Sequence, residues 1–300
     1  MTAIAAAPPS RLAAWKMAVR LPTLTAALAP VVVGSSAAFH DDALAIGPAA
    51  AALVGALALQ AGANFANDVF DFERGADTAE RLGPPRATQM GLLSPAQMKL
   101  GMWFAFAAAM VCGIYLTYEA GWVVVAIGLA SIAGAIIYTG GPWPIGYHAL
   151  GDLFTFVFFG LVAVIGTYFV QTKEVTGFAL LASIPVACTV TCILVVNNLR
   201  DIETDRRAGK TTLGVVMGDR GTRTWFGVLM VAAWLAMAVG IFAGAPWAAL
   251  ALLASVPLGI RLYRPIWSGT VGRELNPILK ATARYHLFLG LLWAAALAIG

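Results

Sequence analysis

Charge is what this sequence lacks most: only 11% of its 300 residues are charged, and 60% are hydrophobic. A soluble globular domain carries about 25% charged residues. So small a charged fraction excludes an ordinary soluble enzyme or binding module and favours a polytopic membrane protein. The formal net charge of +4 does not indicate a nucleic-acid partner, because in a membrane chain the position of the charges carries the information.

Cysteine and histidine are also scarce, with three residues each. Cys112, Cys188 and Cys192 all lie inside apolar runs. Neither a disulfide framework nor a thiolate metal site is therefore supported, and we expect these cysteines to be small buried hydrophobic residues. No His or Cys stands at a spacing typical of zinc or iron sites. The first apolar stretch is too long for a cleavable signal peptide and is followed by further spans.

Long apolar runs dominate what is present. A helix that crosses a hydrocarbon core of about 30 Å needs about 20 residues, and nine runs approach or exceed this length: about 21–39, 46–68, 98–118, 121–139, 152–171, 177–199, 223–243, 246–262 and 284–300. Strand-like alternation is absent, and backbone groups in lipid must be satisfied within each segment. We predict an all-α membrane protein with nine transmembrane helices, forming one domain over residues 1–300.

The basic residues predict the orientation of this bundle. If the N-terminal segment 1–19 is cytosolic, every one of the 19 basic residues except Lys173 falls in a cytosolic segment. Cytosolic loops of membrane proteins carry the excess of Lys and Arg. The sequence therefore predicts a multi-pass protein of the inner (cytoplasmic) membrane, with its N-terminus and its charged loops in the cytosol.

Two acidic clusters interrupt the apolar chain, one at the end of the second run and one at the end of the sixth. The first contains Asn64, Asn67, Asp68, Asp71 and Asp77, and the second contains Asn197, Asp201 and Asp205. Carboxylates beside a bilayer are costly and usually mark a functional site. Helical spacing would place each set on one face. Two such faces make an oxygen-rich pocket, which suits a hard cation such as Mg²⁺.

Basic residues flank both clusters: Arg81, Arg86, Arg206, Arg207 and Lys210. Together with a metal, Arg and Lys side chains suit a diphosphate, whose charge must be neutralised as a leaving group departs. Arg81, Arg207 and Arg220 could equally form solvated ion pairs in the loops.

The motifs now support a resemblance. Residues 67–77 (Asn-Asp-Val-Phe-Asp-Phe-Glu-Arg-Gly-Ala-Asp) resemble the first aspartate-rich motif of the UbiA superfamily of intramembrane prenyltransferases, and residues 197–213 resemble the second. Four further stretches, 81–91, 138–142, 150–152 and 274–277, are most similar to the branch that acts on 1,4-dihydroxy-2-naphthoate. The opening Arg20-Leu-Pro22-Thr-Leu is similar to that family's Arg-Pro-x-Thr-Leu, with the proline displaced by one.

This resemblance implies a bundle around a central cavity, and an enzyme that joins a prenyl chain from a polyprenyl diphosphate to dihydroxynaphthoate. Carbon dioxide would be lost and demethylmenaquinol, a menaquinone precursor, would form. Mg²⁺ would be held by Asp68, Asp71, Asp201 and Asp205, and the diphosphate by Arg86, Arg206 and Lys210. Asp71, Arg86, Lys210 and Tyr138 are the expected catalytic residues, and Asn64, Asn67 and Asn197 would bind substrate. Tyr138, Tyr147 and Phe158 are candidates to face an allylic cation.

Two alternatives stay open. A prenyltransferase of the same fold with another acceptor, such as 4-hydroxybenzoate or homogentisate, or with a phytyl donor, would carry the same acidic motifs. A cation-coupled transporter is the alternative from another class, although transport sites usually lie near the bilayer midplane whereas these aspartates gather at one membrane face.

Overall fold

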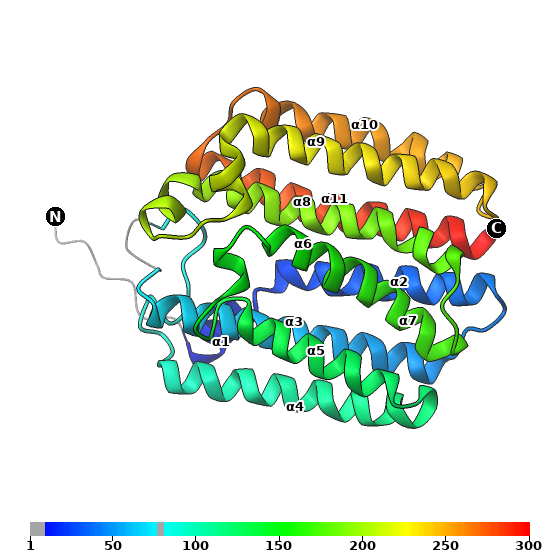
Figure 1. Cartoon of the computed structure of the whole chain (residues 1–300), viewed down its shortest axis with the longest axis horizontal. Coiled ribbons are helices and arrows are strands. Elements are labelled where there is room, and N and C mark those ends of the chain that lie inside the picture. The colour runs from blue at the N-terminus through cyan, green and yellow to red at the C-terminus, as the bar shows by residue number, and fades with distance from the viewer. Residues whose placement is uncertain (1–9, 77–80) are drawn as a thin grey trace.

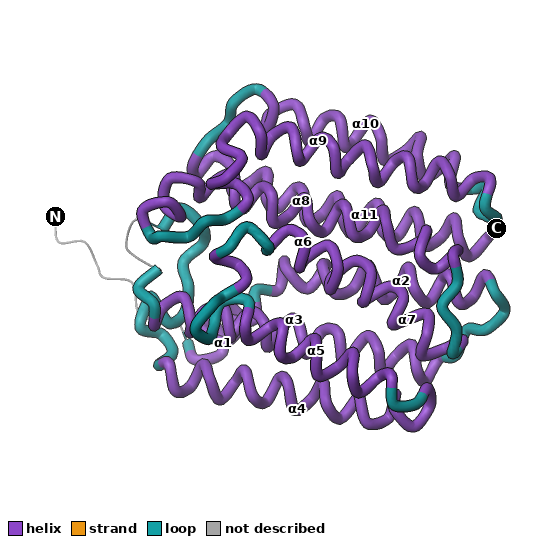
Figure 2. The backbone as a smooth tube through the Cα atoms, viewed as in Figure 1, coloured by secondary structure: helices purple, strands orange, loops and turns teal. Residues whose placement is uncertain are grey.

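The computed structural model describes residues 10–76 and 81–300, and within them the chain is almost entirely helical (Figures 1 and 2). Its elements, in chain order, are α1 (Arg11–Val19), η1 (Leu21–Leu24), α2 (Thr25–His40), α3 (Ile46–Glu73), α4 (Pro95–Ala120), α5 (Val123–Ile137), η2 (Ile145–Tyr147), α6 (Gly151–Thr155), η3 (Phe156–Val162), α7 (Ala163–Thr172), α8 (Gly177–Arg207), α9 (Leu213–Phe242), α10 (Ala248–Trp267), η4 (Gly272–Glu274) and α11 (Leu275–Ile299).

The predicted all-α membrane fold is confirmed. Eight helical stretches of the described chain are long and apolar enough to cross a membrane, and α5 is a ninth, shorter one. The 15 residues of α5 span about 22 Å at 1.5 Å per residue, less than the hydrocarbon thickness. This span is short because the chain leaves the helix at Tyr138 and turns through Gly141, whose φ is 74°.

Local sequence explains where several helices begin. Ser94 accepts a hydrogen bond from the backbone N–H of Gln97, whose side chain accepts one from the N–H of Ser94, so α4 starts with a capping box. The hydroxyls of Thr176 and Thr212 cap α8 and α9 in the same manner as the serine does. With this cap at Thr212, α9 begins at Leu213, ten residues before the apolar run that we predicted to begin at residue 223. Gly218 introduces a kink into this additional N-terminal part of the helix.

The loops divide between the two ends of the bundle. Figure 1 shows the connections after α3, α5, α8 and α10 gathered at one end, and those after α2, α4, α7 and α9 at the other with the C-terminus. Helices α3 and α8 extend past their apolar runs to Glu73 and Arg207, toward the first of these ends. Asn64, Asn67, Asp68 and Asp71 therefore stand on α3, and Asn197, Asp201 and Asp205 on α8, at the same end of the protein.

Helix α8 is the centre of the core, where it packs against α2, α9, α11 and η3. Inside lipid the hydrophobic effect does not drive helices together, so they associate through close van der Waals packing, which small residues make possible. A Cβ on Gly160 of η3 would lie 2.1 Å from Cβ of Ala187, so η3 and α8 are in direct backbone contact. Cys188 and Cys192 are buried in this core, as predicted, whereas Cys112 on α4 is only partly buried.

The N-terminal helix α1 is part of the bundle, which the sequence did not indicate. Ala14 and Ala18 are buried, and the ring of Trp15 packs edge-on against Phe65 of α3 with 5.7 Å between the ring centroids. Arg20 then adopts a left-handed conformation (φ 55°) that turns the chain from α1 into η1. This turn brings Arg20 to the end of the bundle where the acidic clusters lie.

Candidate active site

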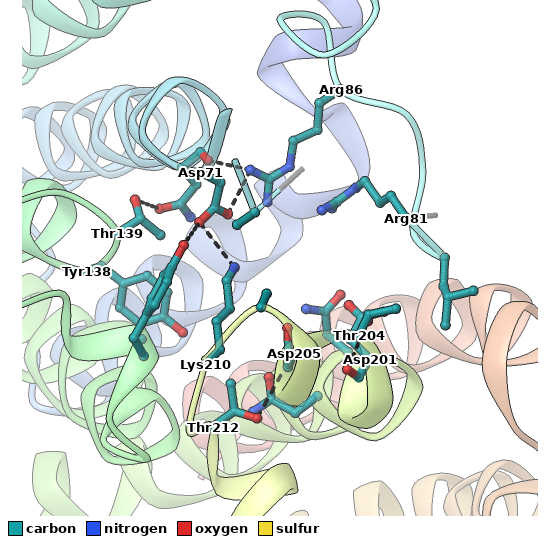
Figure 3. Close-up of a pocket in the computed structure, with 18 of the residues that line it drawn as sticks. Asp71, Arg81, Arg86, Tyr138, Thr139, Asp201, Thr204, Asp205, Lys210 and Thr212 are labelled. Carbon is teal, nitrogen blue, oxygen red and sulfur yellow. Dashed lines mark hydrogen bonds and ion pairs between the residues drawn. The ribbon is translucent and has the colours of Figure 1, made fainter. Parts of the chain in front are cut away.

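A polar cavity of about 370 Å³ opens between the ends of α3 and α8. Its walls are completed by residues of the segments 74–76, 81–86, 138–147 and 208–212 (Figure 3). Eight of the predicted site residues line it: Asn67, Asp71, Arg86, Tyr138, Asn197, Asp201, Asp205 and Lys210. The structure thus brings Asn67 and Asp71 of the first acidic cluster to the same pocket as Asn197, Asp201 and Asp205 of the second, far away in the sequence.

Asp71 forms the α3 side of the pocket and is surrounded by donors. Its Oδ2 lies 2.8 Å from Nη1 of Arg86, and its Oδ1 accepts from the Tyr147 hydroxyl at 2.8 Å and from Nζ of Lys210 at 3.2 Å. The Asp71 and Arg86 side chains are only 3% and 8% exposed, so this pair is shielded from water. Charge-assisted hydrogen bonds of this kind are the strong ones.

Tyr147 connects the two sides of the pocket. Its ring lies under two cations, with Lys210 Nζ 4.5 Å and Arg74 Cζ 5.6 Å from the ring centroid. Burial, followed by the nearby negative charge of Asp71, raises the pKa of Tyr147 above its usual value. The hydroxyl therefore stays protonated and donates to Asp71 at neutral pH. The backbone N–H of Thr211 donates to the Tyr147 carbonyl at 2.9 Å, which fixes the loop that carries Lys210.

Asp201 and Asp205 form the α8 side. Arg200 binds Asp201 in a bidentate manner, with Nε–Oδ1 at 2.8 Å and Nη2–Oδ2 at 2.5 Å. Within residues 10–76 and 81–300, Asp205 accepts one long hydrogen bond, at 3.5 Å, from the Thr212 hydroxyl. Two carboxylates one helical turn apart thus face the cavity with spare acceptor capacity. In Figure 3 Lys210 reaches between these carboxylates and Asp71.

Arg200 also ties this side of the pocket to two other parts of the chain. Its Nη1 donates to Oδ1 of Asn276 on α11 at 2.9 Å, and the Asn276 amide donates to the carbonyl of Leu82 at 2.9 Å. The guanidinium is pressed against Gly83, where an added Cβ would lie 2.8 Å from Nη2. This network joins the 81–91 and 274–277 stretches to the second acidic motif.

Asn67 and Asn197 present hydrogen-bond donors to the cavity. Oδ1 of Asn67 accepts from the Thr139 hydroxyl at 3.0 Å, and Oδ1 of Asn197 accepts from Arg200 at 2.6 Å. With each amide oxygen engaged, the amide NH₂ group is the part available to substrate oxygens.

Three predicted site residues are not brought to the pocket. Asp68 faces the 86–91 turn, where its two oxygens accept from the backbone N–H groups of Ala87 and Thr88, each at 3.2 Å. Asn64 donates to the Val19 carbonyl and the Thr23 hydroxyl, both at 2.8 Å, and so holds the turn after α1. Arg206 is exposed and pairs with Glu203 at 2.7 Å.

The reason for these placements is helical geometry. Asn64 lies on the same face of α3 as Asp71 but seven residues, or about two helical turns, further from the end that carries the pocket. Asp68 follows Asn67 by about 100° around the helix, so these two side chains face different neighbours. Arg206 points outward from the last turn of α8, whereas Arg207 lines the cavity. Arg81 also lines the cavity, while Asp77 lies outside the described residues.

Sequence reasoning assigned no role to several lining residues, namely Arg20, Thr139, Asn198, Thr204 and Thr212. Asn198, Thr204 and Thr212 fall inside the second motif, and Thr139 falls inside the 138–142 stretch, so the resemblance offered a signal for all four. Arg20 opens the stretch that is similar to Arg-Pro-x-Thr-Leu, but that resemblance carried no assigned role, and the packing of α1 against α3 brings the residue to the pocket.

The aromatic candidates differ in position. Tyr138 lines the cavity. Behind it, the ring of Phe154 lies 5.6 Å from that of Tyr138, and Phe158 stacks on Phe154 at 4.4 Å between centroids. These rings form a row that leads from the polar cavity along α6 and η3 into the apolar bundle.

The oxygen atoms that line the cavity suit the predicted Mg²⁺. Among the described residues no three His, Cys, Asp or Glu side chains form a ready-made metal cluster. Mg²⁺ does not need one, because it usually binds through one or two carboxylates together with substrate phosphates and water. Asp201 and Asp205 supply such a pair, and the described residues that line the cavity include no His or Cys that would favour a softer metal. The residues therefore fit a magnesium–diphosphate complex.

Comparison with known proteins agrees with this geometry. The profile of the UbiA prenyltransferase family matches residues 27–274. The protein is 40% identical to the 1,4-dihydroxy-2-naphthoate octaprenyltransferase of Mycobacterium tuberculosis over 96% of this chain and 98% of that one. It is 32% identical to the Bacillus subtilis protein of the same name, over 95% and 92%.

The fold has a solved counterpart as well. The structure of a UbiA homolog from Archaeoglobus fulgidus bound to GPP and Mg²⁺ superimposes with a TM-score of 0.67, at 14% sequence identity, and covers 94% of this chain and 99% of that one. At that identity the likeness concerns the fold. The family match, the close relatives and the shared bundle show that this chain is a multi-span membrane protein of the UbiA prenyltransferase family.

Proposed function

We propose that this protein transfers a prenyl chain from a polyprenyl diphosphate to 1,4-dihydroxy-2-naphthoate, with loss of carbon dioxide. The observation that carries the proposal is the single pocket in which Asp71, Asp201 and Asp205 meet Arg86 and Lys210 at one end of an apolar bundle. The two curated relatives at 40% and 32% identity bear the name of this activity.

The position of the pocket suits an amphiphilic donor. A diphosphate requires charged partners and water access, while a long prenyl tail is soluble only in lipid or in an apolar channel. The cavity lies at the charged end of the bundle, and the row of Tyr138, Phe154 and Phe158 leads away from it toward the apolar interior. The donor can thus place each of its parts in a suitable environment.

We propose Asp201 and Asp205, together with Asp71 on the opposite wall, as the residues that hold Mg²⁺ against the diphosphate. Bound there, the metal neutralises phosphate charge and makes the diphosphate a better leaving group. Asp68 is left out of this set because both of its oxygens are engaged by the backbone of Ala87 and Thr88. Arg206 is left out of the diphosphate site because it faces solvent and Glu203.

The chain's own residues supply the rest of the chemistry. As the C–O bond of the donor breaks, its electron pair leaves with the diphosphate, and Arg86 and Lys210 stabilise that growing charge. The Tyr138 ring offers an electron-rich face to the allylic carbon. The amides of Asn67 and Asn197 donate hydrogen bonds to substrate oxygens. A new C–C bond then forms to the naphthoate ring, whose carboxylate departs as carbon dioxide.

The orientation follows from the same placement. All basic residues except Lys173 are expected on the cytosolic side, and Arg81, Arg86, Arg207 and Lys210 among them line the pocket. We propose that the pocket opens to the cytosol from the inner membrane.

Purified protein in liposomes, supplied with a labelled polyprenyl diphosphate and carboxyl-labelled dihydroxynaphthoate, tests the proposal. Labelled carbon dioxide should appear in step with prenylated product, turnover should stop in excess EDTA and return with Mg²⁺, and 4-hydroxybenzoate should be a poor acceptor. Faster turnover with 4-hydroxybenzoate or homogentisate, or product that keeps its carboxylate, would assign a different acceptor to the same fold. A preference for phytyl diphosphate would reassign the donor.

A further inference from the structure

Asp152, at the start of α6, is a buried carboxylate that does not line the cavity. It is 4% exposed, and each of its oxygens has one partner. Oδ1 accepts from Nδ2 of Asn198 on α8 at 3.1 Å, and Oδ2 accepts from Nε1 of Trp225 on α9 at 3.0 Å. A charged group inside a membrane bundle is costly and usually has a functional reason. Asp152 contacts the site through Asn198.

The bond to Asp152 determines which way the Asn198 amide points. A primary amide has an acceptor end and a donor end. A carboxylate oxygen can only accept, so the NH₂ of Asn198 must face Asp152 and its Oδ1 must face the other way. Asn198 lines the cavity, and across residues 10–76 and 81–300 no donor is found for that oxygen. An acceptor oxygen is therefore directed to the pocket.

Asn198 belongs to the same face of α8 as the acidic pair. Asn198, Asp201 and Asp205 stand at i, i+3 and i+7, which places all three on one side of the helix, and all three line the cavity. Gly214 fixes the residue from behind, because a Cβ there would lie 3.1 Å from Cβ of Asn198. With its Cβ held in place, the Asn198 side chain can replace the acceptor oxygen that faces the pocket by the donor NH₂ only by rotating its amide.

We propose that Asp152 is a positioning residue: it holds the Asn198 amide so that its oxygen, together with Asp201 and Asp205, forms the oxygen-donor face that binds the divalent cation. This inference rests on the proposed function of the pocket. It gives Asp152 of the 150–152 stretch a role in the site through its hydrogen bond to Asn198.

The substitution Asp152→Asn tests the inference because it should reverse the amide. The Trp225 N–H can only donate, so the introduced asparagine would turn its oxygen toward Trp225 and its NH₂ toward Asn198. Asn198 would then flip and present NH₂, a hydrogen-bond donor, to the cation. The exchange Asp152→Asn/Asn198→Asp should repair this, because the introduced asparagine can donate to the introduced aspartate, whose second oxygen then faces the pocket.

Binding of Mn²⁺ as a spectroscopic probe is the readout, measured by electron paramagnetic resonance in detergent with an unreactive geranyl thiodiphosphate present. Asp152→Asn should weaken Mn²⁺ binding by about 10-fold or more, as loss of a partner behind a metal ligand commonly does. The exchange variant should return to within about threefold of the wild type. Trp225→Phe is the matched control: it removes the other partner of Asp152 but leaves the bond to Asn198, so Mn²⁺ binding should change by less than about threefold.

The melting temperature of each variant, measured without metal, distinguishes a loss of folding stability from a reversed Asn198 amide. Wild-type Mn²⁺ affinity in Asp152→Asn, no recovery in an exchange variant that melts like the wild type, or equal losses in Asp152→Asn and Trp225→Phe would each overturn the positioning role and leave the proposed function intact. Failure of the wild-type protein to bind Mn²⁺ in this assay would instead overturn both the metal site and the role built on it.

Discussion

Gly83 offers a sharp test of how Asp201 is held in place. A Cβ at this position would lie 2.8 Å from Nη2, 3.1 Å from Cζ and 3.3 Å from Nη1 of Arg200. The guanidinium cannot move aside freely, because the same Nη2 lies 2.5 Å from Oδ2 of Asp201 and 2.6 Å from Oδ1 of Asn197. Gly83→Ala should therefore displace the arginine and, with it, the carboxylate.

The size of the effect follows from the contact. Restoring an ordinary separation of about 3.5 Å requires a shift of roughly 0.7 Å at Nη2. A misplacement of about 1 Å in a catalytic group can cost about 10²-fold in rate. We expect kcat/KM to fall by about 10- to 100-fold, which corresponds to about 1.4–2.7 kcal/mol of transition-state stabilisation.

Steady-state prenyl transfer in liposomes measures this loss. Gly113→Ala is the matched control, because its added Cβ would meet no atom within 4 Å, and it should retain wild-type activity. If Gly83 acts through Arg200, then adding Gly83→Ala to an Arg200→Ala protein should cost little more. Activity of Gly83→Ala within about twofold of the wild type, or a full additional loss in the Arg200→Ala background, would refute the reasoning.

Three further outcomes follow from where the structure places the predicted residues. Lys210→Ala should lower kcat/KM by about 10²-fold while Arg206→Ala changes it by less than about threefold, since only Lys210 reaches the pocket; similar losses would return Arg206 to the site. Asp68→Ala should lower the Tm by several degrees, because two buried backbone donors lose their acceptor at about 1–3 kcal/mol each; an unchanged melting curve would contradict this. In a protein without native cysteines, Arg206→Cys should react with an impermeant maleimide only from the cytosolic side and Glu119→Cys only from the opposite side. Reversed labelling would show that the proposed orientation in the membrane is wrong.

The fold was largely readable from the sequence because lipid leaves few choices. Each apolar run had to be a helix. Basic residues are concentrated in every second loop, and this alternation indicated how many helices cross the membrane. Ends of elements were less accessible: α9 begins at Leu213 because Thr212 caps it, and α5 stops after Ile137. Neither hydropathy nor charge carries that information.

The site was readable to the level of motifs but not of single side chains. The acidic spacing indicated the correct helices and the correct end of the bundle. Which of two adjacent residues faces the cavity depends on helix rotation within the packed bundle, and this separates Asn67 from Asp68 and Arg207 from Arg206. Contacts such as Arg200 with Asn276 join positions 76 residues apart, so they arise from packing that no local pattern encodes.

The pairing of Asp71 with Arg86 and Lys210 has a thermodynamic consequence. In the structure these three charges satisfy one another at 2.8 and 3.2 Å. A diphosphate that arrives alone must compete with Asp71 for the two cations, and a metal that arrives alone must compete with the two cations for Asp71. When both arrive, each releases the partner that the other needs. Their binding should therefore be positively coupled, and linkage requires the diphosphate to tighten metal binding by the same factor by which the metal tightens the diphosphate.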